Sequence, residues 1–133
     1  MEKFINDYVE MEYDNNILVA KFTNKETYFN MELAKRMVRE RIEFTKGEKH
    51  YMCLYASNFT YAGNDVRKFM SNEGAENILA GAFIVNSAFS SVFFNFFIKV
   101  SGMGNKTPMR CFTSEESAIE WIKDLKKNEL IEI

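Results

Sequence analysis

The chain has 133 residues, a length that fits one domain better than two. Apolar residues make up 47% of it, with 6 glycines and 1 proline, which excludes a disordered or linker-like chain. The formal net charge is -2, from 17 basic and 19 acidic side chains, so no basic excess indicates nucleic-acid binding. The 2 cysteines and 1 histidine are too few for a disulfide scaffold or a cysteine–histidine zinc site, and we expect no metal and no cofactor.

The first predicted elements are two strands joined by a turn. Residues 8–13 alternate in character, as in a strand with one wet face, and residues 17–22 are apolar on both faces. Asp14, Asn15 and Asn16 between them tolerate positive φ and favour a turn. We therefore expect an antiparallel hairpin whose second strand lies deeper in the sheet than the first.

A helix is predicted next, with Asn30 as its N-cap and Gly47 as its end. Residues 51–56 then form a continuous apolar run, as in a buried parallel strand, and His50 before them is expected at the surface. The buried stripe of the helix is expected to comprise Ala34, Met37, Val38 and Thr45, with the aliphatic stem of Arg41 at its edge.

Residues 57–63 are predicted to form a polar loop, followed by a helix that Asn64 caps and a buried strand over residues 78–85. The segment from Asn77 to Ile98 carries no charge and is long enough for a membrane span. We expect no span, because polar or small residues interrupt the segment at Asn77, Gly81, Asn86, Ser87, Ser90, Ser91 and Asn95.

A third helix is predicted after Asn86 or Ser87, and it carries more apolar side chains than one face requires. The stripe that faces the sheet would consist of Phe89, Val92, Phe93, Phe96 and Val100. Phe94 and Ile98 point away from it, a turn apart, and Phe97 lies at its edge. An aromatic patch with few charges is typical of an interface core, so we predict a homodimer through Phe94, Phe97 and Ile98. The alternative is that a C-terminal tail, residues 128–133, covers this patch within one chain.

A short strand at residues 109–112 and a helix that begins at Thr113 complete the chain, with Glu116 forming a capping box. The predicted order is β-β-α-β-α-β-α-β-α. It gives an α/β fold with a single mixed sheet, an N-terminal antiparallel hairpin and helices packed on the sheet. The strands at 51–56 and 79–85 are expected to be neighbours, and residues 1–133 form a single domain.

This order and the closing stretch from Thr107 to Ile122 are similar to STAS-like proteins, and more narrowly to small bacterial SpoIIAA-like proteins of the STAS/CRAL-TRIO type. The stretches Asp65 to Phe69 and Asn95 to Phe97 also resemble positions of that family. The resemblance implies a bacterial protein related to anti-anti-sigma switches. Those proteins bind a kinase partner until a serine at the start of the second helix is phosphorylated. Here residues 61–65 are Tyr-Ala-Gly-Asn-Asp, without that serine.

No residue pattern for catalysis appears in the sequence. Cys53 and Cys111 each fall in an apolar strand, where a thiolate is disfavoured, so we expect buried and unreactive thiols. The stretch Gly102-Met103-Gly104 follows a helix and lacks the third glycine of a dinucleotide-binding loop. We therefore expect a non-enzymatic protein with no catalytic, cofactor-binding or metal-binding residues.

A binding site is expected beyond the carboxyl ends of the parallel strands, where open sheets bind ligands and helix N-termini offer free N–H groups. The polar residues predicted there are Ser57, Asn58, Thr60, Tyr61, Asn86 and Ser87, and the alternative is that these are ordinary loop residues and caps. Two functions stay open: an interaction or regulatory module that binds a protein partner, and a carrier or sensor of a small apolar ligand such as a lipid. The first residues include no signal-peptide-like region, so a cytoplasmic location is expected.

Overall fold

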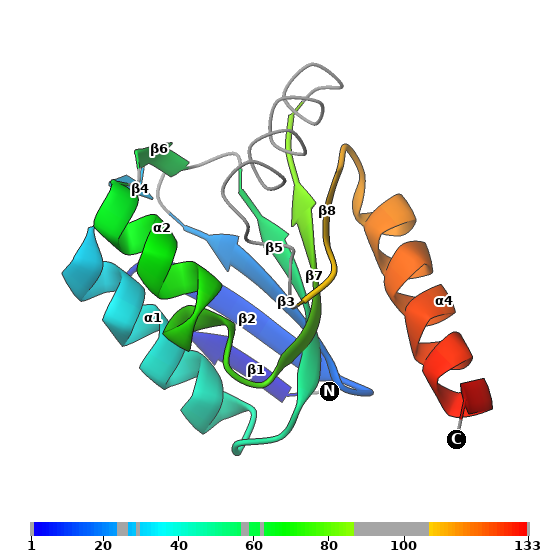
Figure 1. Cartoon of the computed structure of the whole chain (residues 1–133). Helices are drawn as coiled ribbons and strands as arrows, with labels where there is room; N and C mark the ends of the chain where they lie inside the picture. Colours follow the sequence, from blue (N-terminus) through cyan, green and yellow to red (C-terminus); the bar gives the residue numbers. More distant parts are fainter. Residues whose placement is uncertain are drawn as a thin grey trace.

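A six-stranded mixed sheet forms the centre of the molecule (Figure 1). The computed structural model describes residues 2–23, 27–28, 30–56, 59–61, 63–86 and 107–132. The strands lie in the order β1-β2-β3-β5-β7-β8, with bounds β1 Glu2–Ile5, β2 Val9–Asp14, β3 Ile17–Phe22, β5 His50–Tyr55, β7 Ile78–Ile84 and β8 Met109–Phe112. β1 to β3 pair antiparallel, whereas β3, β5, β7 and β8 are parallel. The predicted mixed sheet with an antiparallel start is confirmed, and β5 and β7 are neighbours as expected.

The hairpin of β2 and β3 turns at Asn15 and Asn16, as the sequence predicts. Their φ angles are +51° and +64°, and two consecutive positive values are what a two-residue type I′ turn requires. Strand β1 was not predicted. It pairs Phe4 with Met11 of β2, and the Phe4 ring lies 5.7 Å from that of Phe44, so one apolar side chain fixes this edge strand to the core.

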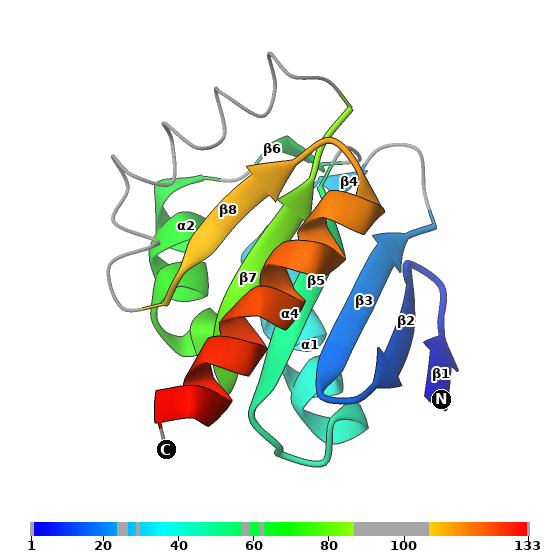
Figure 2. The same ribbon diagram turned by 90° about the vertical axis from the view of Figure 1, so that its right-hand side faces the viewer.

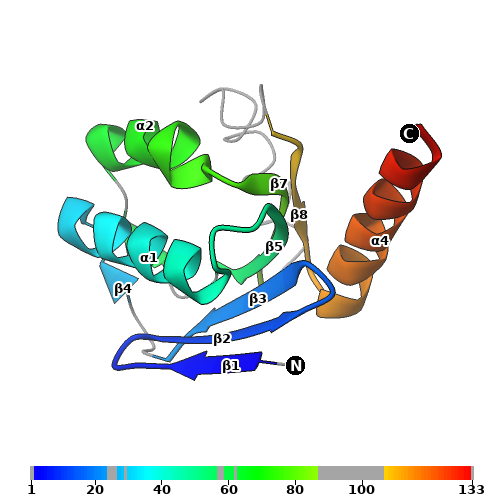
Figure 3. The same cartoon turned by 90° about the horizontal axis from the view of Figure 1, so that it is seen from below.

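Helices cover the two faces of the sheet unequally. α1 (Met31–Phe44) and α2 (Asn64–Ser71) lie on one face, and α4 (Glu115–Glu132) lies on the other (Figure 1, Figure 3). The crossovers β3-α1-β5 and β5-α2-β7 step in the same direction, so right-handed connections place both helices on one face. Figure 2 shows α4 running across β5 and β7, with β1, β2 and β3 beside it.

Three shorter elements complete the described part of the chain. The 3-10 helix η1 (Glu73–Ala75) follows α2, and β4 (Thr27–Tyr28) pairs with β6 (Phe59–Tyr61) in a separate two-stranded parallel sheet. Because β6 occupies residues 59–61, the prediction of a loop throughout 57–63 was wrong for that part. The pairing partner lies in a segment that the sequence analysis assigned to no element.

The N-terminal ends of α1 and α4 follow local capping rules. The prediction that Asn64 caps α2 was wrong, because α2 begins at Asn64 itself and its N-cap is Gly63, which has no side chain to accept a hydrogen bond. The Asn30 side chain accepts a hydrogen bond from the Leu33 N–H at 2.8 Å, and Gly47 adopts a φ of +73° beyond the end of α1, which confirms both predictions. At α4 the cap is Ser114 rather than Thr113, because the Ser114 hydroxyl accepts the Ser117 N–H at 3.2 Å. α4 continues to Glu132, so residues 128–132 belong to this helix and form no separate tail.

Each face of the sheet has its own apolar cluster. Under α1 the buried side chains include Val9, Met11, Leu18, Ala20, Ala34 and Met37. Under α4 they include Cys53, Ala80, Ala82, Ala118 and Ile122. None of the helices in the described ranges combines the length and apolar character that a membrane crossing requires.

Candidate functional site

Strands β5, β7 and β8 end at one edge of the sheet, where the sequence predicts a binding site. Pairing extends one residue beyond the strands: the Ala56 N–H donates to the Ile84 carbonyl and the Val85 N–H to the Phe112 carbonyl, both at 2.9 Å. Asn86 follows directly and is exposed. The structure therefore places Asn86 at the predicted edge with its side chain accessible to solvent.

The other residues predicted at this edge are less completely placed. Thr60 and Tyr61 belong to β6. Ser57, Asn58 and Ser87 lie outside the described residues, as do Phe94, Phe97 and Ile98 of the predicted dimer patch. The site at the carboxyl ends and the homodimer both stay predictions.

A contact at the same edge ties the start of α4 to the sheet. The Tyr55 hydroxyl donates to a Glu115 carboxylate oxygen at 2.5 Å, and the Lys21 ammonium lies 4.7 Å from the centre of the Tyr55 ring. Burial and the hydrogen bond to Glu115 raise the pKa of Tyr55. The phenol therefore stays protonated at neutral pH and acts as a structural donor.

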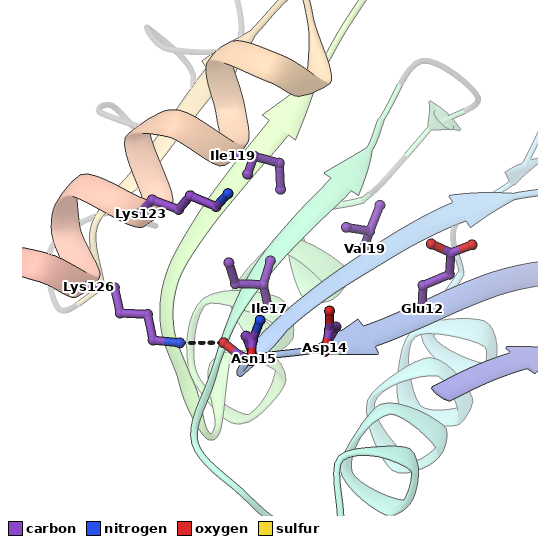
Figure 4. A pocket seen from close by; sticks show the side chains of 8 residues that line it. All are labelled: Glu12, Asp14, Asn15, Ile17, Val19, Ile119, Lys123 and Lys126. Carbon is purple, nitrogen blue, oxygen red and sulfur yellow. Dashed lines mark hydrogen bonds between the residues drawn. The ribbon is translucent and has the colours of Figure 1, made fainter. Parts of the chain in front are cut away.

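A groove of about 370 Å³ lies between α4 and the β2–β3 hairpin (Figure 4). We call it the hairpin groove; it is lined by Glu12, Asp14, Asn15, Ile17, Val19, Ile119, Lys123 and Lys126. The Lys126 ammonium donates to the Asn15 carbonyl at 2.5 Å, which joins the far half of α4 to the hairpin turn. The groove therefore has one wall from the hairpin and one from the helix.

The lining residues of the groove form three strips that differ in charge, because of the side-chain alternation of the strands and the periodicity of the helix. Cross-strand pairing sets Glu12 opposite Val19 and Asp14 opposite Ile17, and paired residues point to the same side of a sheet. The spacing of Ile119, Lys123 and Lys126 places all three on one side of α4. An acidic strip on β2, an apolar strip on β3 and a basic strip on α4 thus lie side by side (Figure 4).

This groove was not predicted from the sequence. The predicted position of residues 17–22 deep in the sheet is correct, but the prediction did not say how far each face of this strand is covered. On the α4 side Ile17 and Val19 are only half-buried and Lys21 is exposed. The available signal was an apolar outward face on β3 beside an acidic outward face on β2, two patterns that meet only once the pairing register is known.

A buried polar cluster lies at the opposite edge of the sheet, where β5 begins. Arg41 is 1% exposed and donates to the carbonyls of Gly74 and Glu76 at 2.9 and 2.7 Å. Burial lowers the pKa of Arg41 to about 10. The prediction that only its aliphatic stem lies at the edge of the stripe was wrong, because one carbonyl within η1 and one just after it accept hydrogen bonds from the guanidinium.

His50 belongs to the same cluster and is fully buried, so its predicted surface position was wrong as well. Its Nδ1 lies 2.9 Å from the Glu48 carbonyl. Since a carbonyl only accepts, Nδ1 carries the proton and Nε2 is bare, without a hydrogen-bond partner in the part of the chain that the structure describes. Burial lowers the pKa of His50, which keeps the ring neutral at pH 7.

Both cysteines are buried within strands, Cys53 fully and Cys111 at 4% exposure. Burial raises the pKa of each thiol to about 12. Thiolates are therefore rare at neutral pH at both positions. Across the described ranges, no group of three or more His, Cys, Asp or Glu side chains is arranged to hold a metal ion.

Comparison with known structures confirms the SpoIIAA-like fold that the sequence predicts. The chain is similar to an uncharacterised protein of the DUF3478 family with a SpoIIAA-like fold from Shewanella loihica PV-4, with a TM-score of 0.58 and 11% sequence identity. That match covers 89% of this chain and 97% of the other. The chain itself belongs to a family described as Domain of unknown function (DUF7793), whose model matches residues 11–126. No curated protein sequence matches it.

Proposed function

We propose that this protein is a non-enzymatic module that binds a protein partner. The observation that carries the proposal is the hairpin groove, whose apolar floor is half-exposed between two charged walls. Enclosed, mostly apolar cavities suit small ligands, whereas an apolar strip with a polar rim suits the surface of another protein. The open form and mixed charge of this groove favour the second kind of occupant.

The state of the reactive side chains supports a non-catalytic role. The thiols of Cys53 and Cys111 are buried with a pKa of about 12. The ring of His50 is buried and uses Nδ1 in a bond to the backbone. A nucleophile or general base must reach its substrate in the right protonation state, which these three groups do not offer.

Affinity capture with the full chain tests the proposal. The immobilised protein is incubated with extract of its native host, and captured proteins are compared with those on a denatured sample of the same chain by quantitative mass spectrometry. We expect at least one protein that, once purified, binds the folded chain saturably with a Kd of about 10 μM or tighter. Absence of any such protein, together with a bound lipid mass in native mass spectrometry, would replace the proposal with an apolar-ligand carrier.

A further inference from the structure

The face of the sheet that carries α4 is only partly covered by helices in the described part of the chain. α4 contacts β5, β7 and β8, and β1, β2 and β3 lie beside it (Figure 2, Figure 3). Neighbouring strands are about 4.8 Å apart, so three strands span about 10 Å. That width equals the distance at which a second helix packs beside a first.

We call the part of this face formed by β1, β2 and β3 the ribbon, and its length also fits a helix. Strands β2 and β3 have 6 residues each, which at about 3.3 Å per residue gives about 20 Å. A helix rises about 1.5 Å per residue, so about 13 residues, between three and four turns, would run the length of the hairpin.

The ribbon offers an apolar floor for such a helix. Ile17 and Val19 of β3 and Ile119 of α4 are half-buried and line the hairpin groove. Ile5 of β1 is 67% exposed, and its pairing with Glu10 places it on the same side of the sheet. Ile5 is separated from β3 by the acidic face of β2 and is an ordinary exposed apolar residue, whereas Ile17, Val19 and Ile119 line one groove together.

The walls determine which charges an occupant must carry. On β2 the outward side chains are Glu10, Glu12 and Asp14; Glu12 pairs with Lys3 at 3.5 Å, while the other two form no ion pair with any described residue. On α4, Lys123 is exposed and likewise without an ion pair among the described residues. A complementary occupant therefore carries cations on its β2 side and anions on its α4 side.

A second copy of this chain does not match these walls. The outward face of α4 is charged, with Glu116, Glu120, Asp124 and Lys127, and offers no apolar stripe. The predicted third helix is apolar but has no charge before Lys99, so it has no charged side chains that could pair with those of β2 and α4. A lipid chain carries no charges along its length and therefore would not pair with the acidic side chains of β2 or the basic side chains of α4.

We propose that the hairpin groove binds one amphipathic helix of a partner protein, about 13 residues long. The apolar stripe of that helix packs on Ile17, Val19 and Ile119. Basic residues on one flank face β2, and acidic residues on the other flank face Lys123 and Lys126 of α4. The inference rests on the proposed function and adds the site and the structure of the bound segment.

Selection from a helical peptide library on the full chain tests this directly. The peptides share a fixed apolar stripe, and their flanking positions are randomised between Lys and Glu. On the wild type we expect enrichment of peptides with Lys on one flank and Glu on the other. The double variant Asp14→Lys, Lys123→Glu reverses one exposed charge on each wall and should enrich the opposite arrangement, with about tenfold weaker binding of the original peptides. Random flanks on both proteins would overturn the inference.

Two further variants separate this inference from the proposed function. Val19→Lys places a charge in the floor and should abolish peptide binding, whereas Lys35→Glu on the exposed side of α1 should leave it unchanged. If a captured host protein binds Val19→Lys as tightly as it binds the wild type, the partner-binding function holds and the groove is not its site. A wild-type dimer in sedimentation that the double variant dissociates would assign the groove to a second copy and overturn the inference.

Discussion

Arg41→Met tests how the polar cluster under β5 contributes to stability. Arg41 is among the largest fully buried side chains of the described residues, and its guanidinium joins α1 to the connection between α2 and β7. Methionine has a similar length and keeps most of the apolar contacts of the stem. The substitution therefore removes the charge and the two hydrogen bonds without opening a large cavity.

The expected effect follows from two opposing contributions. Lowering of the Arg41 pKa from 12.5 to about 10 corresponds to a destabilisation of the buried charge by about 3 kcal/mol. Hydrogen bonds from a charged donor contribute about 1.5–3 kcal/mol each, so the bonds to Gly74 and Glu76 supply about 3–6 kcal/mol. The difference between the two contributions is about 0–3 kcal/mol, so Arg41→Met should lower the free energy of unfolding by about 1.5 kcal/mol.

Arg41→Lys separates the charge from the geometry of the guanidinium. Lysine keeps a buried charge, but its single ammonium cannot span two carbonyls as a guanidinium fork does. It should therefore be less stable than Arg41→Met in urea denaturation followed by circular dichroism. Arg39→Met, an exposed site on the same helix, is the control and should stay within about 0.5 kcal/mol of wild type. A lysine variant more stable than the methionine variant would refute the reasoning.

Three further outcomes can be measured with the same protein. Burial holds the pKa of His50 below its unfolded value of about 6.5, so the unfolded state binds the proton first. Stability should fall below that pH by up to about 1.4 kcal/mol per unit, a slope that His50→Gln removes in urea titrations. Cys53 and Cys111 should react with a thiol reagent at least about 100-fold more slowly than in urea, and rapid native labelling would contradict their burial. Ile122→Ala should cost about 2–5 kcal/mol, against less than about 0.5 for the exposed Ile5→Ala; equal losses would place the core elsewhere.

The features that the sequence predicts correctly are those that short-range chemistry determines. The Asn15–Asn16 turn needs two residues that tolerate positive φ, and Asn30 needs only an N–H three residues ahead. The apolar run at 51–56 follows from burial on both faces, which β5 has except at Tyr55. Each of these patterns is complete within a few residues, so no knowledge of distant contacts is required.

The errors concern residues whose partners are far away in the chain. Arg41 is buried because the carbonyls of Gly74 and Glu76 receive it, more than thirty positions later. His50 is buried because Tyr13 packs edge-on against its ring at 6.2 Å and the Glu48 carbonyl accepts a hydrogen bond from its Nδ1–H. Polar residues enter a core when such partners exist, and their existence depends on the tertiary structure.

The hairpin groove shows the same limit on a larger scale. β3 is apolar on both faces, and the sequence alone predicts only that it lies deep in the sheet. α1 and its neighbours bury one face, whereas α4 packs mainly through Ala118 and Ile122 over β5 and β7 and leaves Ile17 and Val19 half-open. An antiparallel pair of strands often has one face exposed to solvent, and the side chains on that face are then polar. On β3, by contrast, Ile17 and Val19 lie between acidic side chains of β2 and basic side chains of α4. An apolar strip with charged borders is typical of a protein–protein interface. This combination, rather than exposure alone, supports the docking proposal.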